Sequence, residues 1–126
     1  MKIKENKKAP SFKLPGTSSI DFDLKDIKGK LLIYFYPKDD TPGCTIETKD
    51  FSRLYKKLRK IKCELVGISK DPLQSHEKFK KKYKVPYELL SDIDVKVQKK
   101  YGIWGTKSFM GKKFLGTIRS TVFIDK

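Results

Sequence analysis

The 126-residue sequence has no long hydrophobic run. No stretch approaches the roughly 18 apolar residues that a membrane-spanning helix needs. The basic start, MKIKENKKAP, has no apolar segment behind it and does not match a secretory signal. We therefore expect a cytoplasmic protein without a membrane partner. The length fits one domain over residues 1–126, and a hydrophobic content of 37% with 8 Phe and 6 Tyr suffices for one packed core.

Cysteine and histidine are also scarce. Cys44 and Cys63 are far apart and form no CxxC or metal-ligand spacing. With His76 as the single histidine, a zinc site is disfavoured, and we expect neither a metal nor a cofactor. A structural disulfide is disfavoured as well, because the cytosol keeps thiols reduced. The two cysteines are therefore expected to be free thiols, either inert or catalytic.

Arginine is rare although the net charge is +15. Only three of the 30 basic residues are arginines, and the lysines are scattered along the whole chain. Nucleic-acid sites favour arginine, because its planar fork contacts phosphates and bases in pairs of hydrogen bonds. We therefore expect no specific nucleic-acid partner, only weak adhesion to polyanions at low salt.

Apolar patterning predicts strands that alternate with helices. We expect a β-hairpin within residues 12–24 and strands at 31–36, 63–68, 87–90 and 117–124. Three helices are expected: an amphipathic one with Phe51, Leu54, Tyr55 and Leu58 on one face, one opened by Asp71 and Pro72 that reaches about Tyr83, and one capped by Asp92 that reaches about Tyr101. Residues 102–116 are expected to form a long loop. This alternation indicates an α/β domain with right-handed crossovers.

Cys44 stands between the apolar run 31–36 and the helical stretch, in KDDTPGCTIE. Thr41 suits the N-cap, Pro42 the first helical position, and Gly43 lets the backbone approach a ligand. Cys44 would then lie in the first helical turn, where free N–H groups and the helix dipole stabilise a thiolate. This setting predicts a reactive cysteine, the alternative being a buried, inert one. No histidine nearby could serve as a base, which disfavours a protease-like pair.

Several motifs carry a resemblance to a known family over nearly the whole chain. They are FYPKDDTPGCTIE, VGISKDP, LLSD, YGIWGTKSFMGKKFLGTIRSTVFID and the APSFKLP opening. With these motifs the chain resembles the peroxiredoxins, and among them the bacterioferritin-comigratory or peroxiredoxin Q subfamily. The resemblance implies a thioredoxin-like fold and a thiol-dependent peroxidase that reduces hydrogen peroxide and organic hydroperoxides through a cysteine sulfenic acid, in antioxidant defence. The implied reductant is thioredoxin, glutaredoxin or a small thiol.

The resemblance also assigns roles to individual residues. Cys44 is implied to be the peroxidatic cysteine, with Thr41 and Pro42 completing its pocket beside Gly43. Arg119 is implied to come next to Cys44 from a later strand. Its guanidinium keeps its charge and can donate to both the sulfur and the peroxide oxygens. Read without the resemblance, Arg119 would be a surface arginine.

The chain departs from the family pattern in two respects. Many members carry a resolving cysteine five residues after the peroxidatic one, where this chain has Lys49. Cys63 falls at a core strand position, so we expect burial, a resolving role being the alternative. Members also continue past VFID with a strand and a helix. We therefore expect a fold that lacks these two elements, exposes apolar area and forms a monomer or weak homodimer.

Two other functions stay open at this stage. A thioredoxin-like redox or binding module without peroxidase activity would share the fold, but it would normally show CxxC. A basic nucleic-acid-associated protein would use the charge and would not need the arrangement around Cys44.

Tyr36 and Trp104 are expected either to line the pocket mouth or to pack in the protein interior. His76 is expected to face solvent on its helix.

Overall fold

The computed structural model describes residues 8–17, 19 and 21–125. Ile20, which belongs to the predicted hairpin, lies outside the described residues. So do residues 1–7, which form most of the basic segment MKIKENKKAP. Among the residues described, no helix is both long and apolar enough to span a membrane.

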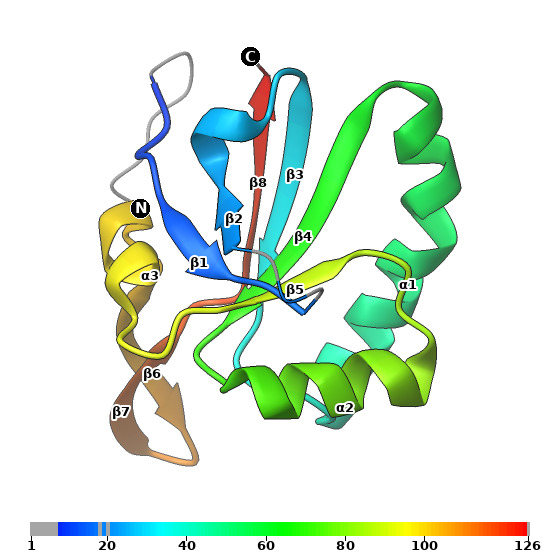
Figure 1. Cartoon of the computed structure of the whole chain (residues 1–126). Helices are drawn as coiled ribbons and strands as arrows, with labels where there is room; N and C mark the ends of the chain where they lie inside the picture. Colours follow the sequence, from blue (N-terminus) through cyan, green and yellow to red (C-terminus); the bar gives the residue numbers. More distant parts are fainter. Residues whose placement is uncertain (1–7, 18, 20, 126) are drawn as a thin grey trace.

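A mixed four-stranded sheet forms the centre of the molecule (Figure 1). Its strands, in spatial order, are β5 (Glu88–Ser91), β4 (Cys63–Ser69), β3 (Lys30–Phe35) and β8 (Ser120–Asp125). The first three are parallel, and β8 runs antiparallel to β3. Helix α1 (Pro42–Lys60) connects β3 to β4, and α2 (Leu73–Tyr83) connects β4 to β5. The predicted α/β organisation is therefore confirmed.

The remaining elements are shorter. They are β1 (Lys13–Pro15), β2 (Asp21–Asp23), the 3-10 helix η1 (Leu24–Asp26), α3 (Lys96–Tyr101), β6 (Trp104–Phe109) and β7 (Lys112–Thr117). Strands β1 and β2 form the predicted antiparallel hairpin. Helix α3 begins later than expected, although the Asp92 carboxylate still accepts hydrogen bonds from the Val97 and Gln98 N–H groups.

The prediction of a long loop over residues 102–116 is wrong, because β6 and β7 form an antiparallel hairpin there. The glycines suggested a loop, but two of them lie opposite each other in the hairpin ladder, Gly105 against Gly116. Gly111 forms the turn with a positive φ of 80°, a conformation that glycine adopts without steric cost. Gly105, Gly111 and Gly116 thus serve a hairpin, whereas Gly102 is the C-cap of α3.

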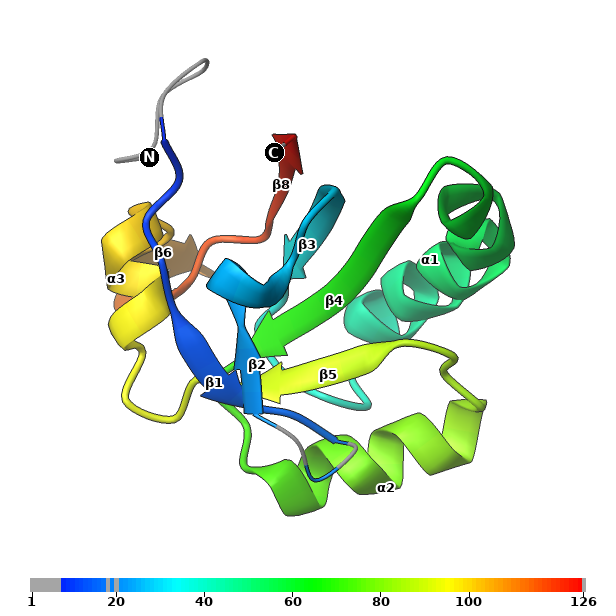
Figure 2. The same ribbon diagram turned by 45° about the horizontal axis from the view of Figure 1, so that its top comes forward.

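Strand β3 explains how one sheet supports two cores. Leu31, Ile33 and Phe35 point into a cluster with the β1–β2 hairpin and α3. Tyr34 and Tyr36 point to the opposite face, into a cluster with Cys44 and side chains of α1 and α2. Successive strand residues face opposite sides, so the apolar run is buried on both. Figure 2 shows the elements on the two sides of the sheet, with β1, β2 and α3 on one and α1 and α2 on the other.

Helix α1 lies against the second of these clusters. Phe51, Tyr55 and Leu58 pack on it, as their spacing predicted. Leu54 does not, since it is 44% exposed. Helix α2 begins at Leu73 with Pro72 as the N-cap, one residue later than expected. The Asp71 side chain does not cap the helix, because its Oδ2 accepts a hydrogen bond from the Asp39 N–H.

Candidate active site

Cys44 lies in the first turn of α1, just beyond the carboxyl end of β3. Thr41 is the N-cap, with extended backbone, and Pro42 is the first helical residue. The first helical hydrogen bond runs from Thr45 N to Thr41 O at 2.8 Å. The N–H groups of Gly43 and Cys44 precede this bond and have no acceptor within the helix, so they favour an anion at the cysteine together with the helix dipole.

Arg119 lies beside this cysteine although it is 75 residues away in sequence. Its Nη2 donates to Cys44 Sγ at 3.1 Å, and its Nη1 donates to Glu47 Oε1 at 2.7 Å. Partial burial alone would lower the pKa of Arg119, but hydrogen bonds and charge interactions with Cys44 and Glu47 outweigh it and raise the pKa. The guanidinium therefore stays charged next to the sulfur.

Glu47 is a site residue that sequence reasoning missed. It lies one turn after Cys44, and its carboxylate accepts from Nη1 of the guanidinium, while Nη2 donates to the sulfur. Burial raises the pKa of Glu47, against the lowering effect of Arg119. The sequence feature that could have identified Glu47 is its place three positions after a cysteine at a helix start, since residues with this spacing share a helix face.

Thr41 and Gly43 shape the space in front of Cys44. Thr41 Oγ1 donates to Lys38 O at 3.0 Å and does not cap the helix with its side chain. With its hydrogen used in this way, the hydroxyl can offer lone pairs to an incoming O–H group. A Cβ placed on Gly43 would lie 3.5 Å from Arg119 Nη2, so the glycine leaves a methyl-sized space beside the guanidinium.

Cys63 lies at the opposite end of the sheet. It is the first residue of β4, where it pairs with Lys30 at the start of β3, whereas Cys44 follows the end of β3. A strand advances about 3.3 Å per residue, so these two ends are roughly 16 Å apart. A disulfide requires Cα atoms within about 7 Å. The native arrangement does not bring the two cysteines together.

Comparison with known proteins shows the family to which the chain belongs. Residues 6–126 match the AhpC/TSA family. The chain belongs to this family. It is 45% identical to a putative peroxiredoxin Bcp of Coxiella burnetii, over all of this chain and 84% of the relative, and 39% identical to peroxiredoxin Bcp of Bacillus subtilis, over all of this chain and 81% of the relative.

Solved structures place it in the same group. Bacterioferritin comigratory protein of Xanthomonas campestris, studied for its alkyl peroxide reduction activity, superposes with a TM-score of 0.85 at 34% identity, covering 90% of this chain and 73% of that one. The predicted thioredoxin-like peroxiredoxin fold is confirmed. So is the predicted class of enzyme, a thiol-dependent peroxidase that uses peroxide and a thiol reductant. The peroxidase class is therefore preferred to the two alternatives, a redox or binding module without peroxidase activity and a nucleic-acid-associated protein.

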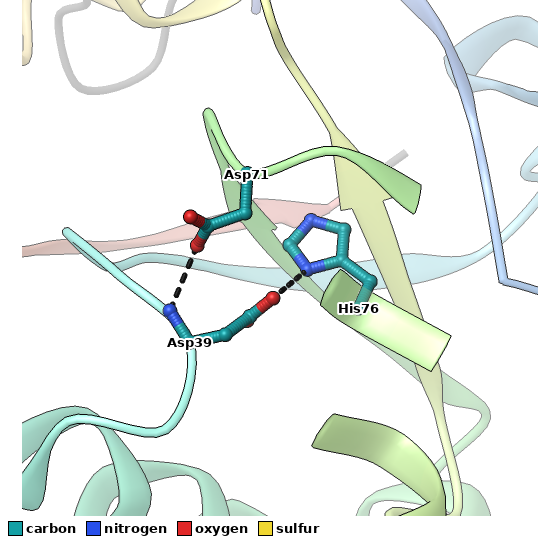
Figure 3. Close-up of side chains that lie close together, drawn as sticks. All are labelled: Asp39, Asp71 and His76. Atoms are coloured by element: carbon teal, nitrogen blue, oxygen red, sulfur yellow. Dashed lines mark hydrogen bonds and ion pairs between the residues drawn. The ribbon is translucent and has the colours of Figure 1, made fainter. Parts of the chain in front are cut away.

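The prediction that His76 faces solvent is wrong for this peroxiredoxin. Its side chain is fully buried, between Asp39 and the backbone of β5 (Figure 3). The sequence feature that could have indicated the burial of His76 is Phe79, which lies three residues further along α2 on the same face and is also buried. An isolated polar residue on an apolar helix face indicates a buried partner, and here that partner came from a distant loop.

Tyr36 and Trp104 have different positions from each other. Tyr36 is fully buried, and its hydroxyl donates to Asp39 Oδ1 at 2.6 Å, so it packs and does not line a pocket mouth. Trp104 begins β6 and is half-buried, with Lys70 Nζ 5.8 Å from its ring centroid.

Asp39, Asp71 and His76 are the described side chains that could together hold a metal, since their ligand atoms lie within 4.8 Å of one another. However, Asp39 Oδ2 and His76 Nδ1 are 2.7 Å apart, a hydrogen-bond distance. Two ligands of a tetrahedral zinc ion would be roughly 3.3 Å apart, given metal–ligand bonds of about 2.0–2.1 Å. Hydrogen bonding accounts for this cluster (Figure 3).

Proposed function

We propose that Cys44 is the peroxidatic cysteine and that this enzyme reduces hydrogen peroxide and organic hydroperoxides. The observation that carries the proposal is the 3.1 Å contact between Arg119 Nη2 and Cys44 Sγ at the start of α1. A guanidinium and a helix N-terminus together stabilise a thiolate, which is the nucleophilic form of cysteine. The relative from Xanthomonas campestris, which reduces alkyl peroxides, supports the inclusion of organic substrates.

The first half-reaction uses the groups around Cys44. The thiolate sulfur attacks one peroxide oxygen in line with the O–O bond. The S–O bond forms, the O–O bond breaks, and two electrons pass from sulfur to the peroxide. The attacked oxygen keeps its hydrogen, so Cys44 becomes a sulfenic acid, and the other oxygen leaves and takes a proton from solvent to give water or an alcohol. Arg119 stabilises the charge on the separating oxygens, because its donors already point at the sulfur.

The substrate is oriented by the residues ahead of Cys44. Thr41 accepts a hydrogen bond from the peroxide O–H, since its own hydrogen goes to Lys38 O. We assign Pro42 and Gly43 to the substrate pocket, next to the N–H groups of Gly43 and Cys44 that have no acceptor within the helix. Gly43 leaves room for the substrate next to Arg119.

The second half-reaction needs an external thiol. Lys49 stands where a resolving cysteine would follow in the helix, and its Nζ lies 5.2 Å from the Tyr83 ring centroid. Cys63 is at the far end of the sheet. A thiolate of thioredoxin, glutaredoxin or a small thiol therefore attacks the sulfenic sulfur and releases water. A second thiol reduces the mixed disulfide and restores Cys44.

Intact-mass spectrometry after one equivalent of peroxide, with a sulfenic-acid trap present, tests this function. We expect one trap adduct on Cys44 and no intramolecular disulfide. A rapid, stoichiometric Cys44–Cys63 disulfide would instead make Cys63 a resolving cysteine. An unmodified Cys44 after peroxide has been consumed would end its assignment as nucleophile.

The surrounding assignments are part of the same proposal. We assign the enzyme to the cytoplasm, as one domain over residues 1–126, acting as a monomer or weak homodimer. Exposed apolar side chains on β7 and β8, such as Leu115 and Phe123, supply area for weak self-association. No specific nucleic-acid partner is assigned, because one of the three arginines already serves Cys44.

A further inference from the structure

We propose that the buried Asp39–His76 pair is a positioning device for Cys44. It holds the loop between β3 and α1, so that the first turn of α1 presents the cysteine to Arg119 and to peroxide. This inference rests on the proposed role of Cys44. Asp39 and His76 touch neither the sulfur nor the substrate space, so they act through the backbone that leads into the site.

Asp39 is the centre of a hydrogen-bond network that joins four parts of the fold. Its Oδ1 accepts from the Tyr36 hydroxyl at 2.6 Å, at the end of β3. Its Oδ2 lies 2.8 Å from Ser75 Oγ, which donates to it, and 2.7 Å from His76 Nδ1, both on α2. Its backbone N–H donates to Asp71 Oδ2 at 2.8 Å, beyond the end of β4 (Figure 3).

His76 extends this network to the sheet. Its Nε2 lies 2.9 Å from Leu90 O in β5, and because a carbonyl can only accept, Nε2 carries a hydrogen. Its Nδ1 lies 2.7 Å from Asp39 Oδ2, a distance that requires one hydrogen between the two atoms. That hydrogen forms the hydrogen bond whether it belongs to the imidazole or to the carboxyl group. The exposed fractions of the two side chains are 0% and 3%. Removing either partner therefore leaves buried polar atoms without hydrogen bonds, which is costly.

The next residue attaches the loop to α2 a second time. Asp40 has a positive φ of 56°, and non-glycine residues keep this conformation when their surroundings enforce it. Its carboxylate accepts from Lys82 Nζ and from the Tyr83 hydroxyl, each at 2.8 Å. Two consecutive loop residues are thus fixed to α2 immediately before Thr41. The position of the site along the sheet edge depends on this attachment.

The experiment compares Asp39→Ala, His76→Leu and Asp39→Asn with the wild-type enzyme, and with Glu77→Gln as an exposed control on α2. Three rates are measured under conditions where every variant is folded: oxidation of Cys44 by peroxide, alkylation of Cys44 by iodoacetamide, and amide hydrogen exchange. Alkylation requires access to the sulfur, whereas oxidation also requires the correct arrangement of Arg119 and the helix start.

We expect Asp39→Ala and His76→Leu to slow oxidation by about tenfold or more, while alkylation becomes several times faster. Cys44 is only 1% exposed, so a loosened loop increases access as it spoils the geometry. Exchange should accelerate at residues 41–47 and stay slow in β4 and β5. Asp39→Asn should stay within about threefold of the wild type, because its amide can donate to Nδ1 while its oxygen accepts from Tyr36.

Other outcomes overturn the inference. Oxidation and alkylation that both stay at wild-type rates would remove the pair from the site. Exchange that rises equally in all strands would mean that the pair only adds stability. If Asp39→Ala and His76→Leu do not fold, Ser75→Ala, which removes one hydrogen bond to Asp39, replaces them. It should slow oxidation and speed alkylation by smaller factors, and wild-type rates for both would remove the pair from the site. Absence of peroxide oxidation in the wild type would refute the role of Cys44, while alkylation and exchange would still test the loop attachment.

Discussion

The two cysteines occupy opposite ends of the central sheet, and both are only 1% exposed. Cys44 has the N–H groups of a helix start around it and receives a hydrogen bond from Arg119. Cys63 begins a strand, and its thiol donates weakly to the Glu64 carbonyl at 3.5 Å. Burial raises the pKa of Cys63, Lys30 opposes the rise and Glu64 adds to it.

With Cys44 as the proposed nucleophile, equal burial gives opposite chemistry. Low exposure does not distinguish a reactive cysteine from a structural one, because both sites exclude water. The difference lies in the groups around the sulfur: Cys44 has the Arg119 guanidinium and the N–H groups of a helix start, whereas Cys63 has no cation bonded to its sulfur among the described residues and donates to the Glu64 carbonyl. Each of the following predictions tests one side of this contrast.

Replacing the cysteines one at a time should give the largest difference. Cys44→Ser should lower peroxide turnover at least about a thousandfold, because the hydroxyl does not ionise near neutral pH. Cys63→Ser should keep turnover within about twofold of the wild type, since its sulfur is at the far end of the sheet. Both should be measured as initial rates with one excess thiol. Retention of activity by the first and its loss by the second would reverse the contrast.

Arg119→Lys should have the next largest effect. The charge survives, but the planar fork that reaches both Cys44 and Glu47 is lost, so the second-order rate with peroxide should fall by roughly 10- to 100-fold. The matched control is Arg59→Lys, at the exposed Arg59–Glu64 pair near Cys63, which should leave the rate unchanged. Equal rates for both variants would remove Arg119 from the site.

The smallest effect should appear in stability at alkaline pH. Because the folded-state pKa of Cys63 is raised, the folded protein keeps the thiol protonated after an unfolded thiol, with a pKa of about 8.5, begins to ionise. Its stabilising contribution is complete below that pH and is lost as pH rises toward the folded pKa.

Cys63→Ala should therefore cost about 1 kcal/mol at pH 7 and show a shallower loss of stability above about pH 8.5. Urea unfolding of both proteins between pH 7 and about pH 9.5, below the range in which tyrosines ionise, measures the two slopes. Parallel curves would mean that this thiol does not respond to its burial.

Much of the fold, and the position of Cys44 at a helix start, followed from local sequence. The apolar run in β3, the helix start at Thr41 to Cys44 and the apolar spacing in α1 are properties of neighbouring residues. Strand burial, capping and helix periodicity act over a few positions, so the pattern itself contains the information. The family motifs added the expectation that Arg119 belongs with Cys44.

Tertiary structure decided what depends on distant partners. Glu47 gained its role only when Arg119 arrived from the segment before β8, and Gly105, Gly111 and Gly116 proved to belong to a hairpin. His76 was expected in solvent but is buried, because Asp39 and the Leu90 carbonyl, 37 and 14 residues away, satisfy both of its ring nitrogens. The free energy of burying a polar group depends on the partner that it meets, and chain folding, not local pattern, brings that partner to it.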